Sequence, residues 1–374
     1  MLLYSFNGEK LSEYVEEITT YDKLVESLRS LFLDYTDKLV QEEIGYEKKL
    51  KEILNAISSF KGNLKDVEPY EPRSFVVLDG ASATIDIEAG YIGAYAALAI
   101  MFPEMRRIYY NDSYGIIPSD PSLLRKTPER VIFNRLIDLV RERKVMELAY
   151  HIIKDHRPEL ILLDGSLLPT PRTGLEDKSE ELRREYNRYS NSICSLHEEA
   201  KNRGVLLVGF VKRARSKILK RASKELIISM KPEIEEAFIG LPDIYDIIIT
   251  DILLGQNEYF PMPPINIRHS FLHEIQVASI FIKSRGDMTP YRIDIGGIAT
   301  KGDRLDIDLI VKSLGFIKNY MTSLGIPFPI LKVDEEVKLS RRLIREIYDD
   351  MRYRYLNRRK GKMLTIKAIW GEYL

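Results

Sequence analysis

The chain has 374 residues, and its 56 basic and 56 acidic side chains cancel, so only local clusters can argue for a nucleic-acid or acidic partner. The single cysteine excludes an internal disulfide and a zinc site made only of cysteines, which suits a reducing cytoplasm. The amino terminus carries acids where a signal peptide is basic, and no apolar run reaches the roughly 18 residues of a membrane helix. We therefore expect a cytoplasmic protein without a membrane span.

The first part of the chain is predicted to be helical. Between residues 10 and 60, apolar side chains recur at spacings of three and four, as in LVESLRSLFLDYTDKLV. Pro69 and Pro72 close this region. We therefore predict an N-terminal helical region over residues 1–70 and a second domain over residues 71–374.

The pattern changes to strands from residue 74 onward. SFVVLD has the uniform apolar character of a buried strand, TIDIEA alternates, and RRIYYN is a third short strand candidate. These segments predict an antiparallel start to a sheet.

Helices and strands then alternate. A helix is predicted over 127–156, opening on Thr-Pro, and ELILLDGS follows as a buried strand. A second helix over 175–204 ends at a glycine, and VLLVGFVKR is the next buried strand. This alternation predicts an α/β fold whose sheet has a parallel portion. Later elements are the strand YRIDIGG and helices over 306–325 and 335–355.

Two of the apolar strands are followed by Asp-Gly, at Asp79 and Asp164. Ligands of α/β sheets bind at the carboxyl ends of strands, so these carboxylates would meet at one rim if their strands are neighbours. Paired carboxylates are suitable ligands for a divalent metal. Asp-Gly is also a favoured turn pair, so a turn role is the alternative for either residue alone.

A site that activates water with two metals needs a third or fourth carboxylate. Glu147 lies on the flank of the apolar stripe of its helix and could project toward the strand end. The alternative is a solvated Glu147 that pairs with Lys144 or His151 at helical spacing. Asp86 and Glu88 are rivals, because strand alternation places both on one face.

Two basic segments could bind phosphates. Lys212 and Arg213 follow the strand VLLVGFV, which places Lys212 at the rim where the acids would gather. Near the carboxyl terminus, residues 352–362 interleave basic side chains with tyrosines, a mixture that can hold phosphates and stack bases. A solvated helix face is the alternative. The basic candidates there are Arg352, Arg354, Arg358 and Arg359.

Other reaction classes lack their signatures. Ser166 does not stand in the GxSxG context of a nucleophile elbow, and the glycines of DGSLLPTPRTG do not form a phosphate-binding loop. Cys194 lies within a predicted helix, so we expect a buried core thiol. The histidines, including His269 and His273 at helical spacing, are too scattered for a zinc set.

An antiparallel section with VLDG, a helix with an inward Glu, then LLDGS and VGFVK together resemble the NurA family of archaeal and bacterial nucleases. The resemblance covers about residues 74 to 350. It implies an RNase H-like core, which is an α/β fold with a mixed sheet and flanking helices, together with the N-terminal helical region and a C-terminal helix. It also implies that Asp79, Glu147 and Asp164 are the acidic metal ligands.

Two positions depart from the family pattern. Members of the family have Gly-Tyr-Pro followed, eight residues after the Tyr, by a His that joins the active site. Here Ile326 and Asp334 stand at those positions. Since hard cations take oxygen ligands, Asp334 would complete a set of four carboxylates. Alternatively, Asp334 would cap a helix that begins at Glu335.

The resemblance implies a Mn²⁺-dependent 5′-to-3′ exonuclease on single- and double-stranded DNA, often with single-strand endonuclease activity. It further implies a homodimer that works with the HerA hexameric ATPase in DNA end resection and recombinational repair. The abundance of Lys, Arg and Glu is common in proteins from hot environments. We expect metal-assisted phosphodiester hydrolysis with Mn²⁺ or Mg²⁺, in which Lys212 and Arg213 offset phosphate charge and the basic C-terminal helix guides the strand. The alternative, motivated by Ile326 and Asp334, is a catalytically impaired NurA-like paralogue that serves as a DNA-binding or ATPase-docking subunit.

Overall fold

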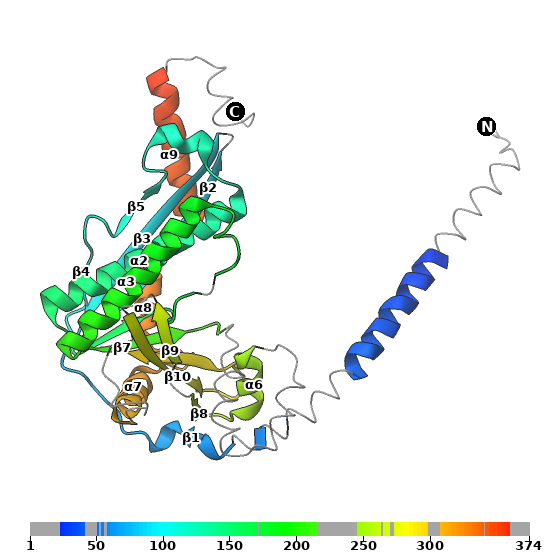
Figure 1. Cartoon of the computed structure of the whole chain (residues 1–374), viewed down its shortest axis with the longest axis vertical. Coiled ribbons are helices and arrows are strands. Elements are labelled where there is room, and N and C mark those ends of the chain that lie inside the picture. Colours follow the sequence, from blue (N-terminus) through cyan, green and yellow to red (C-terminus); the bar gives the residue numbers. More distant parts are fainter. Residues whose placement is uncertain are drawn as a thin grey trace, which may run out of the picture. The chain divides into compact units, whose positions relative to one another are not determined.

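The structure is a computed structural model of the whole chain (Figure 1). It describes residues 23–41, 51, 54–55, 58–87, 89–170, 172–214, 245–262, 265–269, 273–297, 307–339 and 341–359. The chain forms two compact units, one of residues 1–59 with 227–244 and the other of residues 60–226 with 245–374. In the first unit, residues 23–41 form a helix, as the apolar spacing predicts, and every residue of that helix is exposed.

The second unit is built on a mixed sheet of eleven strands. The strand order is β1-β8-β10-β11-β7-β6-β2-β3-β4, with β5 paired to β3 and β9 paired to β10. β6 runs parallel to both β2 and β7, and the other pairs are antiparallel. This arrangement, with its flanking helices, confirms the predicted RNase H-like α/β fold. The strands are β1 Gly62–Asn63, β2 Phe75–Ile87, β3 Gly90–Phe102, β4 Arg106–Ile108, β5 Tyr114–Ile117, β6 Leu160–Leu163, β7 Leu206–Val211, β8 Glu258–Pro261, β9 Ile265–His269, β10 His273–Lys283 and β11 Tyr291–Gly296.

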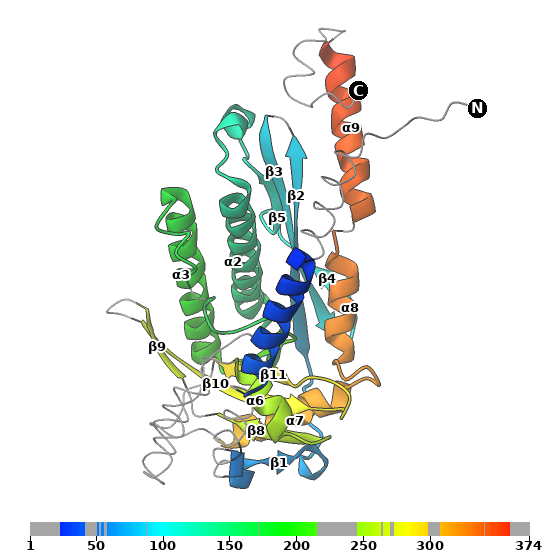
Figure 2. The ribbon, with the colours of Figure 1, turned by 90° about the vertical axis from the view of Figure 1, so that its right-hand side faces the viewer.

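Helices cover both faces of this sheet. Figure 2 shows α2 and α3 on one side of β2 and β3, with α8 and α9 on the other. Alternate residues of β2 point to the two sides, so Val76 and Leu78 join the core under α2 and α3, while Phe75 and Val77 join the core under α7 and α8. The α-helices are α2 Arg130–His156, α3 Glu180–Arg203, α6 Asp246–Leu253, α7 Ile307–Tyr320, α8 Phe328–Val337 and α9 Arg341–Arg359, and short 3₁₀ helices span Ser58–Phe60, Leu64–Asp66 and Pro121–Lys126.

The strand β2 does not end at Asp79, so the prediction of two separate strands there is wrong. SFVVLD and TIDI belong to one strand, which pairs with β3 over its whole length. Only the parallel pairing with β6 stops, at Leu78 opposite Leu163. Gly80 is required for close packing, because a Cβ there would lie 2.7 Å from a methyl of Val145 on α2.

The long strand β3 is absent from the sequence prediction. Its segment GYIGAYAALAIMF is rich in alanine, which favours helices when it is not packed in a sheet. On the face of β3 toward α2, Ala97 and Ala99 join the core beneath that helix. A Cβ at Gly93 would lie 2.8 Å from Ile137 of α2.

Most of the predicted helices are present. α3 is capped by Ser179 and ends at Gly204 in the left-handed conformation. The predicted helix over 335–355 is instead two helices, α8 and α9, and Asp334 lies inside α8. The interpretation of Asp334 as a helix cap is therefore wrong. His269 and His273 are paired across strands β9 and β10 and do not lie on a helix.

Candidate metal centre

Three aspartates from distant parts of the chain converge. Carboxylate oxygens of Asp79, Asp164 and Asp334 lie within 4.8 Å of one another, and we call this group the aspartate cluster. Among the residues that the structure describes, it is the one such group with three or more acidic, histidine or cysteine ligands. The arrangement therefore has the number and type of donor atoms that a divalent cation requires.

Each aspartate is positioned by its own element. Asp79 follows Phe75 and Val77 at alternate positions of β2, so it points to the side of the sheet that α8 covers. Asp164 comes directly after β6, and its N–H donates a hydrogen bond to the Leu78 carbonyl oxygen at 2.9 Å. Asp334 stands on α8 and is the most exposed of the three.

The cluster is electrostatically unfavourable without a cation. Burial and, to a smaller extent, the neighbouring Asp164 together raise the pKa of Asp79 to about 7, against a hydrogen bond of 2.6 Å that the Gly80 N–H donates to the carboxylate. Burial also raises the pKa of Asp164, although Lys212 opposes this rise. Two carboxylates with raised pKa values beside a third fit a site for a positive ion.

Lys212 supplies part of the missing positive charge. It stands one residue beyond β7, and its Nζ lies 2.7 Å from Asp164 Oδ2 and 4.0 Å from Asp334 Oδ2. Arg213, the next residue, is exposed. A lysine in this position can stabilise the cluster and can also reach a phosphate brought to it.

The structure does not bring Glu147 into the cluster. Its Oε1 lies 2.8 Å from Arg143 and its Oε2 lies 2.8 Å from Lys144 on the same helix. Pairing with Lys144 is the alternative that the helical spacing predicts. Glu147 as a metal ligand stays a prediction.

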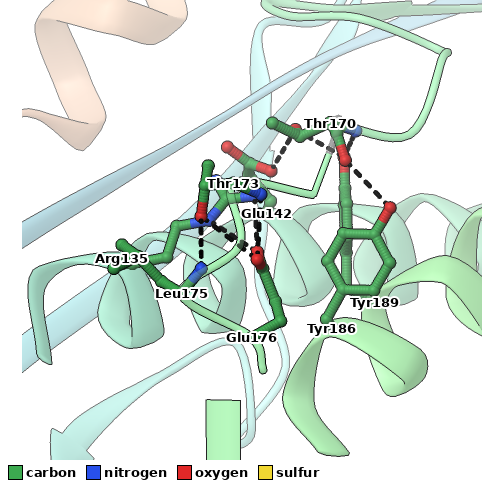
Figure 3. Close-up of polar contacts among 8 residues, drawn as sticks. All are labelled: Arg135, Glu142, Thr170, Thr173, Leu175, Glu176, Tyr186 and Tyr189. Atoms are coloured by element: carbon green, nitrogen blue, oxygen red, sulfur yellow. Dashed lines mark hydrogen bonds and ion pairs between the residues drawn. The ribbon is translucent and has the colours of Figure 1, made fainter. Parts of the chain in front are cut away.

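The carboxylate of Glu142 on α2 is held close to the segment that follows Asp164, and the sequence interpretation missed it. Glu142 Oε2 accepts a hydrogen bond of 3.0 Å from Thr170 Oγ1 (Figure 3). Glu142 Oε1 lies 3.2 Å from Arg141 Nη2. Arg141 is close enough to Asp164 to lower the pKa of that carboxyl, against the larger effect of burial. Arg141 Cγ would lie 2.9 Å from a Cβ at Gly80, a contact that the sequence does not indicate.

A polar network fixes the segment between β6 and α3. Thr170 is contacted by the hydroxyls of Tyr186 and Tyr189 from α3, and the Tyr186 hydroxyl donates to its carbonyl at 3.0 Å (Figure 3). Farther along, the buried Glu176 accepts a hydrogen bond of 2.9 Å from the Thr173 N–H and pairs with Arg135 of α2 at 3.4 Å. The segment that begins with Asp164 is thus attached to both neighbouring helices.

The remaining predicted residues are dispersed. Asp86 forms an ion pair with Arg130 at 2.9 Å on the α2 side of the sheet, opposite to Asp79, and Glu88 lies outside the described residues. On α9, Arg354 is exposed and Arg352 is partly buried. Arg358 and Arg359 belong to the same helix, but their side chains lie outside the described part of the chain.

The surroundings of three further residues do not suit a catalytic role, namely Ile326, Cys194 and His197. Ile326 is partly buried and packs against the core under α7 and α8, so it presents no polar group where the resemblance leads us to expect a tyrosine. Cys194 is buried, which raises the pKa of its thiol to about 11, as expected for a core thiol. Burial lowers the pKa of His197 to about 4, which keeps its ring neutral.

Comparison with known proteins decides the family. The model of the NurA domain matches residues 9–339 of the chain. The chain belongs to the NurA family. None of the curated proteins matches it.

Solved NurA structures share the fold. The NurA nuclease from Sulfolobus solfataricus is 16% identical with a TM-score of 0.58, and the match covers 92% of this chain and 98% of that one. A second NurA structure is 13% identical with a TM-score of 0.53 and coverages of 88% and 98%. A third, solved with manganese, is 12% identical with a TM-score of 0.50 and coverages of 87% and 99%. None of the helices formed by the described residues has the length and apolar character of a membrane span.

Proposed function

We propose that this chain is a metal-dependent deoxyribonuclease in which the aspartate cluster holds Mn²⁺ or Mg²⁺. The observation that carries the proposal is the convergence of three carboxylates from β2, β6 and α8 around a single point. Membership of the NurA family supports it, as does the solved NurA structure that contains manganese. Glu147 would join the ligand set only by leaving its ion pairs with Arg143 and Lys144.

The residues around the cluster have distinct roles in this proposal. A bound divalent cation would activate water and neutralise the charge that develops on the leaving 3′ oxygen. Lys212 then exchanges its contact with Asp164 for a contact with the scissile phosphate, where its charge offsets that of the phosphoryl group. Arg213 and the basic residues of α9 bind the DNA backbone on either side of the cut.

The finer assignment follows the family. We propose 5′-to-3′ exonuclease activity on single- and double-stranded DNA, possible endonuclease activity on single strands, and a role in end resection and recombinational repair with a HerA-type ATPase. The chain would act in the cytoplasm. These assignments rest on the family and not on a contact within the structure.

A homodimer is supported by the helix over residues 23–41. Leu28, Leu31 and Phe32 are 46%, 64% and 70% exposed, and such a run of large apolar side chains is typical of a surface that binds another protein. We infer that this apolar run is the surface at which two copies of the chain associate.

The nuclease proposal is tested by digesting 5′-labelled single- and double-stranded DNA with Mn²⁺, Mg²⁺ or EDTA. We expect cleavage only with a divalent metal, and its loss in Asp79→Asn and Asp334→Asn. Asp86→Asn is the matched control, because Asp86 stands on the same strand and points away from the cluster. Metal-dependent cleavage that survives in both cluster variants would contradict the proposal.

The second candidate is an impaired NurA-like paralogue that binds DNA or docks an ATPase. Ile326 favours it, since an apolar side chain replaces the tyrosine that the family resemblance leads us to expect. A wild-type protein that binds DNA but cleaves none, alone or with a partner ATPase, would establish this candidate.

A further inference from the structure

A buried charged pair lies behind the turn that follows Asp164. Arg292 and Asp294 lie two residues apart on β11, and they are 5% and 0% exposed. Arg292 Nε donates to Asp294 Oδ1 at 2.8 Å, and Nη2 donates to Oδ2 at 3.0 Å. A buried ion pair is weak grounds for a stabilising role, because removing two charges from water offsets their attraction. The role of the pair must therefore be inferred from the residues that it contacts.

The pair holds the turn directly. Ser166 Oγ donates to Asp294 Oδ2 at 2.8 Å, and the Leu167 N–H donates to the same oxygen at 3.2 Å. Arg292 Nη2 donates to Ser166 Oγ at 2.9 Å, as does the Leu168 N–H. Ser166 Oγ thus forms hydrogen bonds with both Arg292 and Asp294 and with the backbone N–H of Leu168 in its own turn.

The turn approaches the Arg292–Asp294 pair across β7, at Gly209, which has no side chain. Asp294 pairs in register with Gly209. A Cβ at Gly209 would lie 2.6 Å from the Gly165 carbonyl oxygen and 3.2 Å from the Leu167 nitrogen. The turn therefore rests on the backbone of β7.

Asp164 is in this way fixed on both sides. Its own N–H is bonded to Leu78 on β2, and two residues later Ser166 is bonded to the pair on β11. We propose that the Arg292–Asp294 pair is a positioning device, which sets the direction of the Asp164 carboxylate toward the other two aspartates. This inference rests on the proposed metal-dependent function.

Two serines allow a matched test. Ser279 Oγ donates to Asp294 Oδ1 at 2.8 Å, the same kind of bond that Ser166 makes to Oδ2. Ser279 stands on β10 and has no contact with the turn among its bonds. Ser166→Ala removes the two side-chain hydrogen bonds between the turn and the pair and leaves the bond from the Leu167 N–H, whereas Ser279→Ala removes a hydroxyl from the pair alone.

We would measure Mn²⁺ binding to the full-length chain by electron paramagnetic resonance of the free ion, after circular dichroism has shown that both variants are folded. Because changes to groups that orient a ligand weaken metal binding about 10- to 100-fold, we expect the Kd for Mn²⁺ to rise about tenfold in Ser166→Ala and less than about twofold in Ser279→Ala. The Mn²⁺ concentration for half-maximal DNA cleavage should rise in parallel.

The outcomes separate the inference from the function on which it rests. An unchanged Kd in Ser166→Ala, or an equal rise in both variants, would overturn the positioning role and leave the nuclease proposal intact. A wild-type chain that binds no Mn²⁺ would overturn both. A rise confined to Ser166→Ala would establish the role, since a general loss of stability would affect both variants.

Discussion

The aspartate cluster should destabilise the protein when no metal is bound. Burial and the adjacent Asp164 raise the pKa of Asp79 from the ordinary 3.8 to about 7. A pKa that is higher in the folded state means that the folded protein binds more protons than the unfolded one. The free energy of unfolding therefore falls as the pH rises from about 4 to about 7, and it then levels off.

Asp79→Asn isolates this effect. One pH unit of difference in pKa corresponds to about 1.4 kcal/mol, so the ionised carboxylate lowers the free energy of unfolding by at most about 4 kcal/mol above pH 7. Asparagine keeps the oxygen that accepts from the Gly80 N–H and removes the charge. We expect the metal-free variant to be more stable than wild type by about 2 to 4 kcal/mol at pH 8, with the difference shrinking toward pH 4.

The assay is urea denaturation in EDTA at pH 4, 6 and 8, followed by the same series in Mn²⁺. Wild type should gain about 2.7 kcal/mol at a metal concentration 100 times the Kd, and Asp79→Asn should gain much less. Asp86→Asn controls for the loss of an aspartate from β2 away from the cluster. If Asp79→Asn is less stable than wild type at pH 8 in EDTA, the electrostatic argument for the cluster is wrong.

Four further predictions concern the surroundings of the site. Glu147→Gln should change Mn²⁺-dependent cleavage less than about twofold, because Glu147 is engaged in ion pairs on its own helix and not in the aspartate cluster. Gly209→Ala should lower the free energy of unfolding by about 1 to 3 kcal/mol in urea, since the new Cβ would lie 2.6 Å from a carbonyl oxygen. Asp334→His should raise the ratio of Mn²⁺- to Mg²⁺-supported cleavage, because imidazole suits transition metals better than Mg²⁺. Leu28→Glu should convert a dimer to a monomer by light scattering if the exposed helix is the interface.

The sequence correctly predicted those helices and strands whose own residues carry a clear pattern. The uniform apolar run of β6, the serine cap and terminal glycine of α3, and the apolar spacing of the helix over 23–41 each determine their element nearly alone. The Asp-Gly after β6 likewise marked Asp164, because β6 ends there.

The errors arose where packing between distant elements decides the structure. β2 continues past Asp79 because its partner β3 continues, and β3 has small residues on its α2 face because that helix packs closely on it. The rotation of α2 is set by its contacts with both the sheet and α3, so the apolar stripe alone could not place Glu147 relative to the aspartate cluster. The position of Asp334 on α8, beside the other two aspartates, depends on the order of all the strands in the sheet. Only the family resemblance indicated this position.

Two electrostatically unfavourable features lie on either side of one turn. The aspartate cluster buries Asp79 beside Asp164, and both effects raise the pKa of Asp79, while the Arg292–Asp294 pair is withdrawn from water beneath the same turn. Neither is explained by the stability of the metal-free fold. A divalent cation would reverse the sign of the first, because it replaces mutual repulsion by attraction to a shared charge. The second becomes useful only if the direction of Asp164 matters, which is the case when its oxygen must meet a metal at a defined distance. Both features thus have one explanation in a metal site that requires Asp164 to be held rigidly.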